Sequence, residues 1–211
     1  MRRLLIVMLF IMLFRFCAFG QGSFEFDNFS ASPSNPAFVT ISTGPGTFNP
    51  ADGPAGAFVG SNYTASAYYL NGTVTDQALF DSSNPILFPS ANTHFFGITG
   101  GLVSDGAGFF DHGGTVTLPT TGTVTVQVRA WYNGGGLYTS YDQSLAAGQN
   151  VGESIPVPVE LAISTQSIFP LGGLLPFTVG VVPEPSVYAL LGVGGLLLFH
   201  QQKKALCSRR C

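Results

Sequence analysis

The chain has 211 residues, of which only 9% are charged, and a formal net charge of −3, which suits one medium-sized domain. Charge is segregated along it: from Gln21 to Val182 there are ten acidic residues and one basic residue, Arg129, a formal net charge of −9. This segment lacks the cationic patch that nucleic acid and anionic lipid surfaces require, so both are excluded as its partners.

Residues 1–20 have the parts of a secretory signal peptide. Two arginines at positions 2 and 3 precede an apolar run over 4–14. Ala18-Phe19-Gly20 then offers small residues at the positions that signal peptidase reads. We therefore expect signal peptidase to cleave before Gln21, which starts an exported domain over 21–181.

The exported domain is expected to fold without covalent or metal support. The three cysteines of the chain are Cys17 in the signal and Cys207 and Cys211 near the C-terminus, so the domain contains none. Two cysteines on a basic tail are half of a metal site, and we predict neither a metal nor another cofactor. Stability must come from the hydrophobic core.

Short alternating runs separated by Gly, Pro, Asn and Asp predict strands and turns from Ser23 onward. The clearest strand is 123–132, where Val124, Val126 and Val128 alternate with polar residues, and we expect it near the centre of a sheet. Further strands are expected over 24–29, 38–41, 63–70, 86–88, 95–98, 115–118, 155–163 and 177–182.

These strands predict an all-β fold, an antiparallel β-sandwich that is jelly-roll-like or immunoglobulin-like, with a single closed barrel as the alternative. Pro156 and Pro158 favour a sheet edge or irregular chain for part of the segment 155–163. No long helical periodicity occurs before Ser186. Beyond this point we expect a single C-terminal hydrophobic helix.

Few side chains in the exported domain could perform catalysis. It has two histidines, His94 and His112, and no cysteine or lysine, so we predict no catalytic residues. Asp105, Asp111 and His112 could offer ligands to Ca²⁺, but their spacing fits neither an EF-hand nor another fixed ligand pattern, so we favour a polar hairpin loop.

Glycoside hydrolysis would need two carboxylates at a set separation, and Asp76, Asp81 and Asp142 are candidates. Their spacing in the sequence does not bring any two of them together. A concave cluster of carboxylates would favour an enzyme, and scattered acids would favour a matrix protein.

Arg129 is the one cation of the exported domain. A guanidinium can pair with a carboxylate and stack on an aromatic ring, so we expect Arg129 to anchor a sheet to a loop rather than to bind a ligand.

Four aromatic residues surround the turn Gly134-Gly135-Gly136, namely Trp131, Tyr132, Tyr138 and Tyr141. Aromatic rings can stack on the apolar faces of sugars, so this group is a possible glycan contact. The alternative is that the four rings belong to the core. Exposed, coplanar rings would favour the first interpretation, and buried rings the second.

The C-terminal segment 182–211 has three parts in a fixed order. The motif Val182-Pro183-Glu184-Pro185-Ser186 comes first, and the apolar run 187–199 follows. A basic end closes the chain with Lys203, Lys204, Arg209 and Arg210. This order predicts a transmembrane helix over 186–202.

The tail resembles the PEP-CTERM sorting signal of exported proteins in Gram-negative bacteria. The resemblance implies an exosortase-type sorting enzyme as partner, cleavage near the Pro-Glu-Pro triplet, and association with exopolysaccharide. The exported domain is similar to an uncharacterised class of such proteins at 21–24, 60–65 and 126–131, which implies no activity.

We therefore expect an exported protein that is anchored in the inner membrane before processing and then lies at the cell surface or in the biofilm matrix. No catalytic activity is evident. The alternatives are a carbohydrate-binding module and a carbohydrate-active hydrolase.

Overall fold

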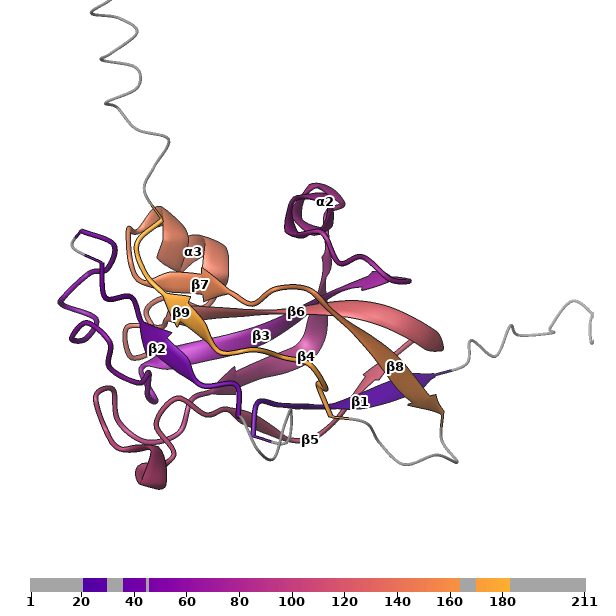
Figure 1. Cartoon of the computed structure of the whole chain (residues 1–211), viewed down its shortest axis with the longest axis horizontal. Coiled ribbons are helices and arrows are strands. Elements are labelled where there is room, and N and C mark those ends of the chain that lie inside the picture. The colour runs from indigo at the N-terminus through magenta and orange to yellow at the C-terminus, as the bar shows by residue number, and fades with distance from the viewer. Residues whose placement is uncertain (1–20, 30–35, 45, 164–169, 183–211) are drawn as a thin grey trace, which may run out of the picture.

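The computed structural model describes residues 21–29, 36–44, 46–163 and 170–182, apart from the side chains of 89–91 (Figure 1). The elements are, in chain order, β1 (Gly22–Asp27), β2 (Val39–Ile41), β3 (Tyr63–Asn71), α2 (Gln77–Ser82), β4 (Ile86–His94), the 3-10 helix η1 (Val103–Asp105), β5 (Asp111–Leu118), β6 (Gly122–Tyr132), α3 (Tyr141–Ala146), β7 (Val151–Glu153), β8 (Val157–Ile163) and β9 (Phe177–Val179). The predicted signal peptide, 1–20, and the predicted transmembrane helix, 186–202, lie outside these residues.

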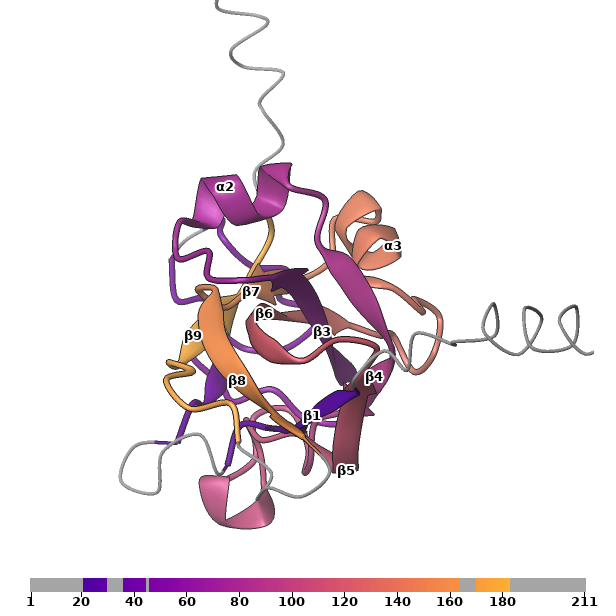
Figure 2. The same ribbon diagram turned by 90° about the vertical axis from the view of Figure 1, so that its right-hand side faces the viewer.

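Seven strands form one antiparallel sheet in the order β4-β3-β6-β8-β1-β5, with β7 also paired to β6. The sheet curls into a half-barrel, so its outer strands β4 and β5 come side by side (Figure 2). Phe95 and Phe110 form an antiparallel bridge there, and the Phe96 N–H donates to the Phe109 carbonyl at 2.8 Å. The prediction of a mostly antiparallel β fold is confirmed.

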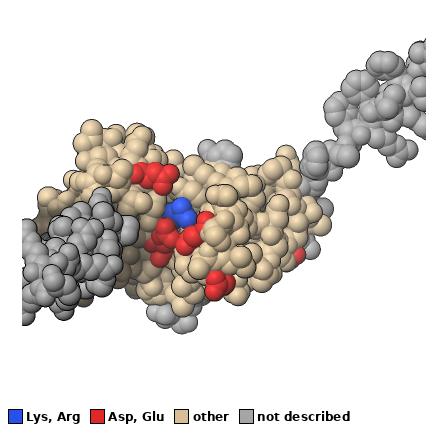
Figure 3. Space-filling view, turned by 90° about the horizontal axis from the view of Figure 1, so that it is seen from above, with Lys and Arg blue, Asp and Glu red and all other residues tan. Residues whose placement is uncertain are grey.

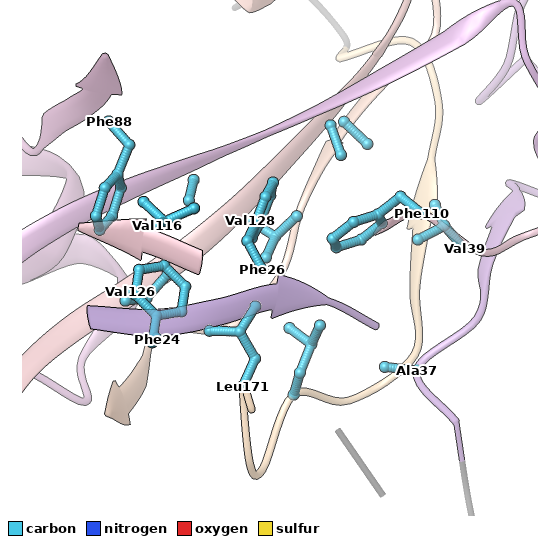
Figure 4. Close-up of a cluster of buried hydrophobic side chains, with 14 of the residues drawn as sticks. Phe24, Phe26, Ala37, Val39, Phe88, Phe110, Val116, Val126, Val128 and Leu171 are labelled. Carbon is cyan, nitrogen blue, oxygen red and sulfur yellow. The ribbon is translucent and has the colours of Figure 1, made fainter. Parts of the chain in front are cut away.

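The main hydrophobic core fills the concave side of the sheet (Figure 4). Phe24 and Phe26 of β1 are fully buried, and their rings lie 5.1 Å from Phe88 and 4.9 Å from Phe110, centre to centre. The parallel ribbon of β2 and β9 adds Val39 and other apolar side chains to the same core. Burying each such ring contributes about 2–3 kcal/mol, which lets this domain fold without disulfides.

The strand predicted at 123–132 is β6, and it lies within the sheet as expected, with β3 on one side and β7 and β8 on the other. Val124, Val126 and Val128 face the core. The side chains of Thr125 and Gln127 on its other face are also buried. The sheet is therefore covered on both faces in this region.

Three features differ, in whole or in part, from the sequence-based expectation. The predicted strand over 95–98 is reduced to an isolated bridge at Phe95. The expectation for 155–163 holds in part: residues 155 and 156 lie outside any strand, whereas β8 itself lies between β6 and β1. Proline is tolerated because β1 pairs only with Ile163 and Ala162, which leaves one side of β8 unpaired at Pro158. The helices α2 and α3 have six residues each, too short to give a periodic signal. Among the described residues, no helix has the length and apolar character needed to cross a membrane.

Candidate functional site

A pocket of about 440 Å³ opens beside β1, the start of β5 and the segment around η1. Three carboxylates and three phenylalanines dominate its lining: Glu25, Asp27, Asp111, Phe29, Phe96 and Phe109. Its volume falls within the range of small-molecule sites, roughly 300–1,000 Å³. This pocket is the candidate functional site.

Strand alternation and a bulge bring the three carboxylates together. Glu25 and Asp27 alternate with the core residues Phe24 and Phe26 of β1; Glu25 is exposed, whereas Asp27 is buried. Glu25 pairs with Thr115, whereas Asp27 pairs with Asp111, so β5 uses two more residues than β1 over this stretch. Bulges of this kind redirect side chains near binding sites.

Gly113 makes the bulge possible. Its φ of 74° lies in the left-handed region that glycine enters without steric cost. Its N–H donates to Asp111 Oδ1 at 2.6 Å. The bulge thus fixes the Asp111 carboxylate at the pocket wall.

Asn28 holds the opposite wall in place. Its fully buried side chain donates to the carbonyls of Ala37 at 2.8 Å and Gly108 at 2.9 Å, and accepts from the Phe110 N–H at 2.8 Å. These three bonds fasten the segment after η1 to the end of β1. Sequence analysis missed Asn28, because its partners lie far away in the chain.

The electrostatic environment of the pocket is uniformly negative. The pKa of the Glu25 carboxyl is raised, first because neighbouring protein removes part of its hydration and then because of the charges of Asp27 and Asp111. Glu25 is nevertheless exposed to solvent, so the shift reflects the pocket wall rather than deep burial. Arg129 is the one lysine or arginine between positions 21 and 182.

The pocket does not match a metal site. In the described part of the chain, no three Asp, Glu, His or Cys side chains come together closely enough to hold a metal ion. Asp105, Asp111 and His112, the possible calcium ligands, therefore do not form a three-ligand group. Asp111 instead lines the pocket beside aromatic rings.

The four aromatic residues considered as a glycan contact do not share one exposed face. Trp131 and Tyr141 are 2% and 4% exposed and form a second small core, against which Tyr138 packs. Tyr132 lies on the opposite face of β6, packs against the main core and meets the Tyr63 ring edge to face at 5.5 Å. Consecutive strand residues point to opposite faces, which separates Trp131 from Tyr132. The alternative interpretation as core residues fits Trp131 and Tyr141.

Arg129 has the structural role that its position predicts. Its guanidinium lies 3.1 Å from Asp81 and 3.6 Å from Glu153, nitrogen to oxygen. It also lies over the rings of Tyr68 and Tyr141, at 4.4 Å and 5.3 Å from their centres. Figure 3 shows this cation surrounded by acidic side chains. The expected carboxylate pairing and aromatic stacking are present, but the segment that Arg129 ties to the sheet is helix α2 rather than a loop.

The acids considered for hydrolysis do not form a pair around Arg129. Asp81 is bound to Arg129, and Asp76 Oδ1 caps α2 by accepting from the Leu79 N–H at 2.7 Å. Asp142 is exposed in the first turn of α3. The concave carboxylate cluster lies elsewhere, at Glu25, Asp27 and Asp111.

Most of the sorting signal lies outside the described residues. Val182 is 48% exposed, and the Val181 N–H donates to the Thr47 carbonyl at 2.9 Å. The other motif residues, Pro183, Glu184, Pro185 and Ser186, and the basic residues Lys203, Lys204, Arg209 and Arg210 are not described.

No family model, curated protein or solved structure matches the chain.

Proposed function

We propose that the chain is an exported protein of the cell surface or extracellular matrix, delivered by a signal peptide and sorted through its PEP-CTERM-like tail. In this proposal signal peptidase and an exosortase-type enzyme are its processing partners, and exopolysaccharide surrounds it after release. The tail holds the protein in the inner membrane until processing. The β domain itself has no catalytic role.

The main support for this proposal is where the folded domain begins and ends relative to the two expected cleavage sites. Strand β1 begins at Gly22, one residue after the expected mature N-terminus at Gln21. At the other end, Val181 is still hydrogen-bonded to Thr47, directly before the Pro-Glu-Pro triplet. The described fold therefore fits between the two expected cleavage sites and would lose no strand to either cleavage.

Intact mass measurement of the protein from its native host tests the proposal. Membrane, surface and medium fractions are compared for the wild type, for Glu184→Ala in the sorting motif, and for Glu160→Gln as an acid control outside it. We expect a released species that starts at Gln21 and ends near 183–185, absent from Glu184→Ala and present in Glu160→Gln. A tail that stays intact in the membrane fraction of the wild type would refute the sorting route.

Carbohydrate binding is a second candidate function, and the pocket at Glu25 favours it. Phenylalanine rings can pack on the apolar faces of sugar rings, and carboxylates accept hydrogen bonds from hydroxyl groups. The site differs from the one expected around Trp131. A concave cluster of carboxylates also suits a glycoside hydrolase. If the wild type cleaves a polysaccharide and the Glu25→Gln variant does not, the pocket is a catalytic site rather than a binding site.

We also propose that the fold is best classed as a jelly-roll-like or immunoglobulin-like sandwich. The β2–β9 ribbon supports this, because its side chains share the core of the curled sheet. The bridge between Phe95 and Phe110 supports the barrel alternative instead. An experimental structure of the full chain would decide between them.

A further inference from the structure

We propose that strand β9 has to detach from its neighbours before the sorting signal can be cut, so that opening of this strand limits the rate of processing. This inference rests on the proposed function, because it takes cleavage near 183–185 as given. The folded domain then controls its own release, because its last described strand holds the cleavage site close to the domain surface.

The end of the described chain is fastened to two neighbouring segments besides β2. β9 itself pairs in parallel with β2 along its whole length (Figure 1). Directly after β9, the N–H and the carbonyl of Gly180 bond to Val151 of β7 at 2.8 Å and 2.9 Å, and the Val181 N–H donates to the Thr47 carbonyl at 2.9 Å. A single residue then separates Val181 from Pro183, the first residue of the Pro-Glu-Pro triplet.

This attachment leaves little chain for an enzyme to enclose the cleavage site. An extended residue spans at most about 3.6 Å, so the bond after Pro183 lies within roughly 10 Å of Val181. An enzyme that recognises an extended segment forms hydrogen bonds to the main-chain groups of several of its residues. The main-chain groups of Gly180 and Val181 already bond within the domain. The enzyme and the folded domain therefore compete for the same segment.

β9 can open without unfolding the rest of the domain. It has three residues and comes last among the described strands, so no later described strand has to move with it. Parallel pairing is slightly weaker than antiparallel pairing, and chain ends open locally at a small part of the global cost. Val179 is the fully buried residue of this strand, so its exposure makes up much of the cost of opening. Release of 177–181 adds roughly 18 Å of reach.

Pulse-chase labelling in the native host tests the proposal, with intact mass to identify the precursor and the product that ends near 183–185. Gly152→Ala loosens β9, because the added Cβ would lie 2.2 Å from the Thr178 carbonyl oxygen. Gly114→Ala is the matched control, since its Cβ would have no neighbour within 4 Å. Val116→Ala is a second control, which lowers stability through the core at β5, in a different sheet from β9.

A further variant removes the restraint instead of weakening it. The flexible sequence Gly-Ser-Gly-Ser-Gly-Ser is inserted between Val181 and Val182, which keeps the sorting motif intact and supplies roughly 20 Å of chain. The same insertion is also combined with Gly152→Ala. Because the insertion leaves the sequence of the folded domain intact, its result stands even where Gly152→Ala fails to fold.

We expect Gly152→Ala to be processed at least about fivefold faster than the wild type, because the rate follows the open fraction when opening is faster than cleavage. The insertion should accelerate processing at least as much, and Gly152→Ala should then add nothing. Gly114→Ala and Val116→Ala should behave like the wild type.

Two results would overturn the control by β9, namely a wild-type rate in the insertion variant, or an acceleration in Val116→Ala equal to that in Gly152→Ala. In both cases the product still forms, so the sorting route stands. Absence of the product from the wild type and from every variant would refute the sorting route, and the control by β9 with it.

Discussion

Asp27 and Asp111 are register partners in the antiparallel pair β1–β5, so two carboxylates stand across from each other at the wall of the pocket. Like charges in directly opposed positions are destabilising. Asp111→Asn removes one charge and keeps the Oδ1 atom that accepts from the Gly113 N–H. We expect this variant to gain about 0.5 kcal/mol in the free energy of unfolding, measured with urea.

The matched control is Asp142→Asn, which removes an exposed acid from the first turn of α3. It reduces the net negative charge equally but leaves the β1–β5 pair unchanged. Equal stabilisation by both variants would show that overall charge, and not the Asp27–Asp111 pair, limits stability.

A second prediction concerns the pH dependence of stability. The Glu25 carboxyl has a pKa above its ordinary value of 4.5, through lost hydration and then the charges of Asp27 and Asp111. The folded state therefore binds this proton more tightly than the unfolded state, so its contribution is fully present below pH 4.5 and is lost as the pH rises through the folded pKa. Wild-type stability should fall relative to Glu25→Gln across this range. The prediction would be contradicted if the unfolding free energies of the wild type and of Glu25→Gln changed with pH in parallel.

The sequence predicts the strands of this protein better than its pocket. Alternation over 123–132 identifies β6, and the isolated charge of Arg129 identifies its pairing role, because both signals are local. The pocket depends on a long-range pairing, which sets Asp111 opposite Asp27 through a bulge at Gly113. No local pattern encodes that register.

The aromatic group near Gly134 is a case in which a local pattern suggested a binding surface that the structure does not contain. Trp131 and Tyr141 are residue types that are typical of sugar-binding surfaces, yet the two rings are buried together with Val151. Helix α3 supplies Tyr141, and its six residues begin at a Ser140 cap rather than in an apolar repeat. Periodicity therefore gave no sign that this face of β6 would be covered.

The Arg129 cluster yields a third prediction. Arg129→Ala would leave Glu153, whose side chain is 26% exposed, without its cation, and would remove the stacking on Tyr68. We expect a loss of about 2 kcal/mol in unfolding free energy, between the values for exposed and buried ion pairs. Arg129→Lys should lose about half as much, because it keeps the charge but not the planar guanidinium. Urea denaturation measures the unfolding free energy of both variants. An Arg129→Ala variant as stable as the wild type would contradict the anchoring role.

Asn28 supplies a fourth prediction, which links stability to the pocket. Asn28→Ala would leave the carbonyls of Ala37 and Gly108 and the Phe110 N–H without this partner in a buried region. We expect a loss of about 3 kcal/mol in unfolding free energy. Amide hydrogen exchange should also become faster over 106–110. The exposed Asn71→Ala serves as control, and normal exchange over 106–110 in Asn28→Ala would contradict the positioning role.

Gly152 in β7 gives the last prediction, because it lies where β9 packs against the sheet. A Cβ atom at this position would come within 2.2 Å of the Thr178 carbonyl oxygen and 3.0 Å of Val179 Cα, so Gly152→Ala must push β9 away. We expect a loss of about 2 kcal/mol in unfolding free energy, typical of overpacking. Gly114→Ala is the matched control, since its Cβ would have no neighbour within 4 Å and its φ is not in the left-handed region. Equal stability of the two variants would mean that β9 contributes nothing to the fold, and the chain before the sorting motif would then be free to leave the sheet.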